Sequence, residues 1–213
     1  MPHRNAVVAL LVLILLVPAA AGAVSIEKGL KAGVNRAGFR GGFADRADTQ
    51  NKLGFVGGPF VAFGLAPDLA VQVEALFSMK GAKTTGERTD EEGHVLGEFT
   101  GFWNLNYLEV PILLRGTLLR TAAVQPMWYI GPTLGLSYGG TFTVDVGAAE
   151  RDLIDLKTVD FGVAIGGGAG FKAGGRRILV ELRYTSGFTD IYDIEDNAES
   201  INDVFSLTVG IAF

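Results

Sequence analysis

Apolar and polar residues alternate along nearly every stretch of this 213-residue chain after residue 24. A period of two is typical of β-strands that present one face to an apolar environment, whereas an amphipathic helix repeats every 3.6 residues. In 202–213, Phe205, Leu207 and Val209 share one face, and Ser206 and Thr208 share the other. The pattern predicts no helix and eight strands, at 27–35, 53–65, 69–80, 103–115, 127–139, 158–172, 177–185 and 202–213.

The connections between these segments alternate in length. Those at 66–68 and 173–176 are very short, and the one at 116–126 is moderate. The other four are longer and polar, and they fall at 39–51, 81–100, 140–157 and 187–201. Outer-membrane barrels combine tight periplasmic turns with longer extracellular loops in this way. We therefore predict an all-β fold, an eight-stranded antiparallel up-and-down transmembrane β-barrel.

The two faces of the predicted strands differ in size and charge. One face carries nearly all the large apolar side chains, including Val163, Leu182 and Val209. The other carries small residues and most of the charges, namely Glu74, Glu109, Arg115, Asp160, Glu181 and Arg183. Because the interior of an eight-stranded barrel is just wide enough for side chains to fill, this second face suits the lumen. We predict that the apolar face meets lipid; the alternative is a soluble, lipocalin-like periplasmic carrier.

The first 24 residues have the features of an export signal. Arg4 gives a short positive region, 6–17 is an unbroken apolar stretch, and Ala21 and Ala23 form a small-x-small cleavage site. We predict a cleaved secretory signal peptide at 1–23 and a barrel domain at 24–213 in the bacterial outer membrane. An uncleaved anchor helix is the alternative, because 6–24 is just long enough to span a bilayer.

Aromatic residues gather near the ends of the predicted strands, as they do in the two girdles of membrane barrels. Those expected at the loop end are Phe102, Trp103, Tyr138, Phe142, Phe188 and Tyr192, and those at the turn end are Trp128, Phe171 and Phe213. Phe213 also resembles the terminal aromatic residue that the barrel-assembly machinery reads in outer-membrane barrels. We therefore expect Phe213 to act as an assembly signal.

The sequence resembles the PorT-like outer-membrane β-barrel family over the whole chain after the signal. The stretches that carry the resemblance are GLKAGVN (29–35), VEALFSMKGAK (73–83), YLEVPILLR (107–115), GFTDI (187–191) and FSLTVGIAF (205–213). The second strand departs from the family, which often has a charged residue where 62–65 is wholly apolar or Gly. The resemblance implies an eight-stranded barrel with both termini in the periplasm, and it implies no particular chemistry.

Composition argues against several classes of function. The chain has no Cys, which excludes disulfides and Cys-ligated metals. A net charge of -5 with only 18 Lys and Arg argues against nucleic-acid binding, which needs a basic surface. The glycine-rich run at 166–170 lies inside a predicted strand, so it is not a dinucleotide-binding loop. We expect no cofactor.

The strongest candidate site is a group of charged residues that share the inward face. Its members are Lys31, Glu74, Glu109, Arg115, Glu181 and Arg183. Two of them, Glu74 and Glu109, should lie at a similar height, which is costly in a low-dielectric lumen unless cations join them. Gly166 and Gly168 should face Arg183 and Glu181 and leave room for the guanidinium. We predict an ion-paired plug that fills the barrel; a gate or ion path is the alternative.

Two weaker candidates involve metal binding and catalysis. Asp190, Asp193, Glu195, Asp196 and Glu199 crowd the last long loop, but their spacing fits no EF-hand, and we interpret them as a solvated acidic loop. Apart from His3 in the signal, His94 is the only His, and its approach to Ser78 at the barrel rim is not required by the spacing. We therefore expect no metal site and no enzyme activity.

These observations favour a non-enzymatic structural or surface protein that acts through its extracellular loops at 39–51, 81–100, 140–157 and 187–201. The expected partners are outer-membrane lipid, the barrel-assembly machinery and a surface ligand of the loops, with no nucleic acid. The alternative is a narrow porin-like channel for small solutes. A filled eight-stranded lumen disfavours it, because aqueous channels typically need about 16 strands or more.

Overall fold

The structure is a computed structural model that describes residues 25–41, 49–90, 92, 94–119, 121–145, 150–152, 157–190 and 200–213. The predicted signal peptide at 1–23 lies outside the described residues, as do Tyr192 and most acidic residues of the last loop. No helix among the described residues is long and apolar enough to cross a membrane.

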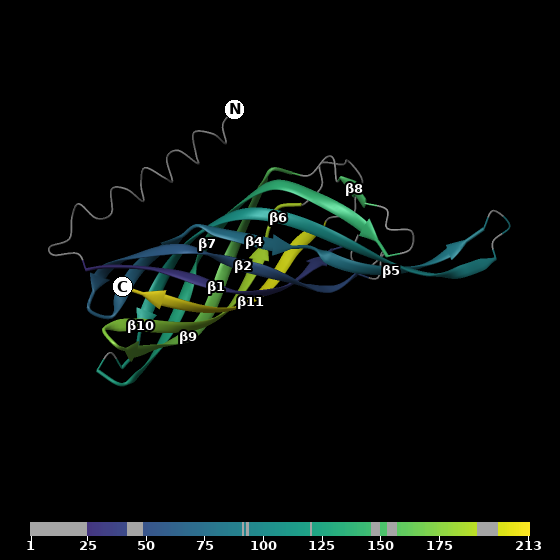
Figure 1. Ribbon diagram of the computed structural model, residues 1–213. Helices are drawn as coiled ribbons and strands as arrows, with labels where there is room; N and C mark the ends of the chain where they lie inside the picture. The colour runs from purple at the N-terminus through teal and green to yellow at the C-terminus, as the bar shows by residue number, and fades with distance from the viewer. Residues whose placement is uncertain are drawn as a thin grey trace, which may run out of the picture.

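The described chain is a single antiparallel sheet that closes on itself (Figure 1). β1 pairs with β2 on one side and with β11, the last strand, on the other, so the sheet closes into a barrel with no free edge there. The strands are β1 (Ile26–Arg40), β2 (Thr49–Ala66), β3 (Leu69–Glu74), β4 (Leu76–Lys80), β5 (Ala82–Thr89), β6 (Val95–Thr117), β7 (Val124–Val144), β8 (Glu150–Asp152), β9 (Val159–Ala173), β10 (Arg176–Gly187) and β11 (Ile201–Ala212).

Eight strands form the barrel wall, because β3, β4 and β5 are consecutive pieces of one strand. All three pair with β2 on one side and with β6 on the other. The breaks fall at Ala75 and at Gly81, whose φ of +125° lies in the region that favours glycine. β8 is a short addition that pairs with the end of β7. The predicted all-β, eight-stranded up-and-down barrel is therefore confirmed.

Two of the predicted loops contain paired strands, and the prediction is wrong there. β5 and the first part of β6 form a ladder whose pairs from Thr85↔Thr100 to Thr89↔Val95 lie within the segment expected as a loop at 81–100. Similarly, β7 continues to Val144 and pairs with β8, within 140–157. These extensions lie beyond the part of the barrel wall that carries the outward apolar side chains. Their strands therefore lack the one-sided hydrophobic pattern that identified the other strands.

Most large apolar side chains point outward and most charged ones of the barrel wall point inward, as predicted, although Phe60, Leu113 and Leu179 are buried inside. Leu182 and Val209 are 57% and 55% exposed on the outer wall, whereas Glu181 and Arg183 are 2% and 7% exposed. A lipocalin-like carrier would have the reverse arrangement, with its apolar side chains around an interior cavity. The soluble-carrier alternative therefore does not fit this barrel.

The two ends of the barrel are distinct (Figure 1). The C-terminus and the β9–β10 turn lie at one end, and the β5–β6 hairpin projects far beyond the other. At the hairpin end, the rings of Trp103 and Phe142 lie 4.6 Å apart between centroids. At the turn end, the backbone amide of Phe213 donates to Lys28 O at 2.9 Å, which holds the last residue against β1.

Candidate functional site: the charged lumen

Four charged side chains form a compact network in the middle of the lumen. Lys31 Nζ of β1 lies 2.8 Å from Glu74 Oε1 of β3 and 2.6 Å from Glu181 Oε2 of β10. Arg183, also of β10, reaches the two carboxylate oxygens of Glu74 at 2.7 and 2.8 Å and Glu181 Oε2 at 3.2 Å. We call these four residues the central network. Its two cations and two carboxylates balance, and its contacts cross the lumen between distant strands.

Burial of the central network follows from strand parity and from the glycines of β9. The β9–β10 ladder has the expected register, with Arg183 opposite Gly166 and Glu181 opposite Gly168. A Cβ placed on Gly166 would come within 2.5 Å of Leu182 O and 3.3 Å of Arg183 Cβ. Glycine thus allows β9 to approach β10 closely beneath the guanidinium. Tyr129 also contacts the network, since its hydroxyl donates to Glu181 Oε1 at 3.0 Å.

A second group of charges lies nearer the hairpin end. Lys80 Nζ of β4 lies 2.7 Å from Glu109 Oε1 and 3.5 Å from Asp160 Oδ2. Asn202 Nδ2 donates to the same Asp160 oxygen at 3.0 Å. The Lys80 ammonium also lies 4.7 Å from the centroid of the Tyr107 ring. We call Lys80, Glu109 and Asp160 the upper network.

A third group closes the turn end of the lumen. Glu27 lies between two guanidiniums, with Oε1 2.5 Å from Arg115 Nη1 and Oε2 3.0 Å from Arg177 Nη1. Arg115 Nη1 also donates to Gln72 Oε1 at 2.9 Å, and Gln72 Nε2 donates to Glu74 Oε1 at 2.6 Å. Gln72 thereby links this lower network of Glu27, Arg115 and Arg177 to the central one.

The six residues singled out from the sequence all lie in the lumen, but they do not form one cluster. Lys31, Glu74, Glu181 and Arg183 come together; Glu109 belongs to the upper network and Arg115 to the lower one. Glu74 and Glu109 do not share a height, because β4 pairs Leu76, not Glu74, with Glu109. Each carboxylate therefore has its own cations.

Sequence reasoning did not include Lys80, Asp160, Glu27 and Arg177 in the site. Lys80 and Asp160 lie on the inward face of strands in which polar and apolar residues alternate clearly. That alternation could have identified both as lumen residues. Glu27 and Arg177 are the second residues of β1 and β10. At the start of a strand, too few alternating residues precede them to indicate which face they take. Which cation meets which carboxylate depends on the relative height of strands that are far apart in the sequence.

The Ser78 and His94 side chains lie in different parts of the molecule. Ser78 is completely buried in the lumen, where its Oγ accepts a hydrogen bond from Asn35 Nδ2 at 2.9 Å. His94 is exposed in the β5–β6 connection, and its Nδ1 lies 3.1 Å from Asp90 Oδ2. The pair does not form the nucleophile and base arrangement that hydrolysis would need.

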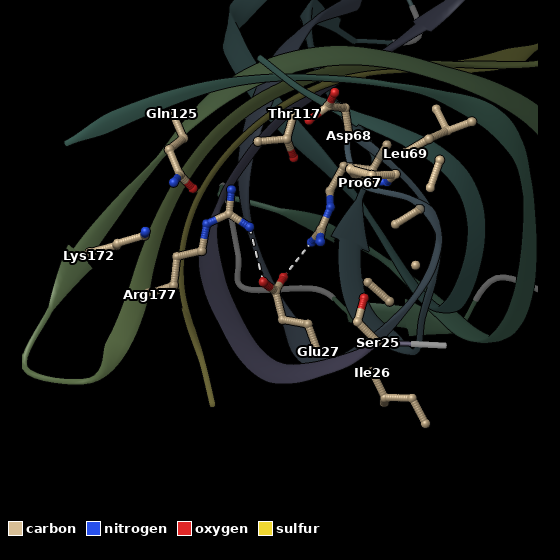
Figure 2. Close-up of a pocket in the computed structure, with 15 residues that line it drawn as sticks. Ser25, Ile26, Glu27, Pro67, Asp68, Leu69, Thr117, Gln125, Lys172 and Arg177 are labelled. Carbon is tan, nitrogen blue, oxygen red and sulfur yellow. Dashed lines mark hydrogen bonds and ion pairs between the residues drawn. The ribbon is translucent and has the colours of Figure 1, made fainter. Parts of the chain in front are cut away.

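A small cavity borders the central network. A cavity of about 20 Å³ lies there, lined by Lys31, Arg183 and Glu109 among others. A single water needs roughly 10–15 Å³ of such volume. The turn end is different, because a pocket of about 310 Å³ opens beside the lower network (Figure 2).

Several solved outer-membrane proteins resemble the chain in structure at low sequence identity. The attachment invasion locus protein Ail of Yersinia pestis, solved with the heparin analogue sucrose octasulfate, is 12% identical (89% of this chain, 99% of that chain, TM-score 0.45). Neisserial surface protein A is also 12% identical (90% and 99%, TM-score 0.48). A major outer membrane protein of Thermus thermophilus is 15% identical (89% and 99%, TM-score 0.49).

No protein of curated function matches the chain in sequence. The sequence profile described as "Outer membrane protein beta-barrel domain" matches residues 23–193, which is most of the chain. This match agrees with the closed sheet, the outward apolar face and the charged lumen. The chain therefore belongs to the outer membrane protein beta-barrel domain family, and it is a small β-barrel protein of the bacterial outer membrane.

Proposed function

We propose that this barrel is a non-enzymatic structural or surface protein that acts through its extracellular side while its lumen stays closed. The observation that carries the proposal is the cavity of only about 20 Å³ at the central network. Side chains that bridge β1, β3 and β10 fill the cross-section there. A lumen of this kind serves as a rigid core and leaves recognition to the loops.

The β5–β6 hairpin is the part best placed for recognition. It projects well beyond the barrel wall (Figure 1), and the first residues of β6, including Val95 and Leu96, are exposed. Val95 and Leu96 are 59% and 56% exposed, and such apolar side chains outside the bilayer are available to a partner. The proposed partner is a surface ligand that binds the hairpin and the neighbouring loops. Nucleic acid is not among the proposed partners.

The PorT-like assignment and the assembly role of Phe213 are further parts of the proposal. The stretch 107–115, YLEVPILLR, is the most specific part of the resemblance that supports the assignment, and it lies in β6. Phe213 follows β11 directly, and β11 closes the barrel against β1. An aromatic residue at that closing strand suits recognition by the barrel-assembly machinery.

Planar-bilayer recording tests the closed lumen against the narrow-channel alternative. We expect the refolded protein to give no discrete conductance steps, because the ion pairs of the central network cross the lumen between β1, β3 and β10. A porin with 16 or more strands, inserted into the same bilayers, is the positive control. Reproducible steps from the wild-type protein would instead establish the channel for small solutes.

Single-cysteine labelling tests which end faces outward, and the chain's lack of Cys makes the labelling unambiguous. We expect Glu92→Cys, in the hairpin connection, to react with a membrane-impermeant maleimide in intact cells. Arg176→Cys, at the β9–β10 turn, should react only after the outer membrane is disrupted, because the short turns face the periplasm. The reverse reactivity would contradict an extracellular hairpin.

A further inference from the structure

The turn end of the barrel contains a pocket that the closed lumen does not explain. It is a partly open pocket of about 310 Å³, lined by strands from around the wall and by the turn between β2 and β3. Figure 2 shows Glu27, Arg177, Lys172, Gln125, Asp68 and Thr117 around it. This volume is at the small end of ligand pockets, which range from about 300 to 1,000 Å³. The pocket therefore suits a small molecule or the end of a chain.

The cations that line the pocket outnumber its acids. Arg115, Arg177 and Lys172 are its cations, and Glu27 and Asp68 are its acids. One carboxylate, that of Glu27, is shared by both guanidiniums, each of which has five N–H donors. Arg115 Nε and Arg177 Nε are buried and have no hydrogen-bond partner among the described residues.

Lys172 is the accessible cation of the pocket. It is exposed at the end of β9, and it has no ion pair within the described ranges. Figure 2 shows its ammonium directed into the pocket, toward the same space that Arg177 and Gln125 border. An anion entering from the periplasm would meet Lys172 first and Arg177 next.

We propose that this pocket binds the carboxylate group of a small periplasmic molecule, for which a peptide C-terminus is the probe. The carboxylate of Glu27 already demonstrates that the two guanidiniums can receive a planar, two-oxygen group, which is the geometry that arginine forks favour. The ligand carboxylate lies beside Glu27, where it contacts the Lys172 ammonium and the Arg177 guanidinium. This site is at the opposite end from the extracellular hairpin, and its exposure to the periplasm rests on the proposed orientation of the barrel.

Titration of the full-length folded barrel in zwitterionic micelles tests the proposal, with backbone NMR shifts as the readout. The probes are acetyl-D-Ala-D-Ala, acetyl-L-Ala-L-Ala, the C-terminal amide of each, and inorganic phosphate. We expect saturable shifts confined to the turn end for the free acids, and binding about tenfold weaker for the amides. A preference for the D,D peptide identifies a cell-wall source, and a preference for the L,L peptide identifies a protein C-terminus.

Three variants distinguish binding in the pocket from nonspecific attraction of anions to the positive charges of the rim. Lys172→Ala should weaken binding about threefold, as expected for a partly exposed ion pair. Glu27→Gln should strengthen it about threefold, because the competing negative charge is removed; unfolding cannot mimic such a gain. Lys28→Ala is the matched control: Lys28 lies on the same rim outside the pocket, with Nζ 5.9 Å from the Phe213 ring centroid.

The expected control result is unchanged affinity for Lys28→Ala. The proposal is overturned if the free acids give no saturable shifts, if the amides bind equally well, or if Lys28→Ala weakens binding as much as Lys172→Ala. It is also overturned if phosphate binds more tightly than the peptides, since the pocket would then be a site for a tetrahedral anion.

Discussion

Glu74→Met should lower the free energy of unfolding by about 3–5 kcal/mol, the range seen when one partner of a buried ion pair is removed. Glu74 is the anionic centre of the central network, because both Lys31 and Arg183 contact it and its side chain is fully buried. Its loss leaves two buried cations with Glu181 as their shared carboxylate. Urea unfolding in lipid vesicles, followed by fluorescence of Trp103 and Trp128, measures the change.

A charge-balanced double variant distinguishes lost pairing from lost packing. Lys31→Met combined with Glu74→Met leaves Arg183 with Glu181, so the interior is neutral again. We expect the double variant to recover at least half of the lost stability. Glu87→Met, in the hairpin outside the barrel, is the control and should change stability by less than about 0.5 kcal/mol. A double variant no more stable than Glu74→Met would contradict the electrostatic explanation.

The gate alternative predicts a different outcome for the same substitution. If the central network were a gate, Glu74→Met would leave the folded fraction nearly unchanged and produce ion conductance. Unboiled samples on a gel report the folded fraction, because folded barrels migrate differently from unfolded chains. A large loss of folded protein without conductance supports the filled, structural lumen.

The sequence was sufficient to predict the number of strands in the barrel wall, which side chains point outward or into the lumen, and the register of one strand pair. In β10, Leu182 and Arg183 differ so strongly in polarity that the alternation leaves a single choice of face. Because β9 and β10 are joined by a tight turn, Arg183 had to lie opposite Gly166, and it does. Local pairing of this kind needs only the turn position and the period of two.

The pairing of charges could not be predicted, because it depends on features that act between distant strands. Parity places Lys80, Glu109 and Asp160 inside, but closure of β1 against β11 and the break at Ala75 set their heights. A shift between Asn106 and Tyr107 also changes the register of β6 with β7. The lower network arises in the same way, because Glu27 of β1 meets Arg177 of β10 only after β11 has joined the two strands.

Leu182→Arg should destabilise the barrel by about 2–4 kcal/mol, the range for a cation on the lipid face at the bilayer midplane. Leu182 lies in the middle of β10, and β11 pairs it with Leu207, another outward apolar residue. An arginine there must lose its hydration or draw water into the acyl layer. The measurement is again urea unfolding in vesicles, with the folded fraction checked by gel mobility.

Leu96→Arg is the control that isolates the role of lipid. Leu96 and Leu182 are the same residue type with almost equal exposed fractions, 56% and 57%, and both lie in strands of the same sheet. They differ in location, since Leu96 is in the hairpin beyond the barrel wall and faces water. We expect Leu96→Arg to change stability by less than about 0.5 kcal/mol. Equal losses at the two positions would mean that β10 does not face acyl chains, and the outward face would then need a different partner.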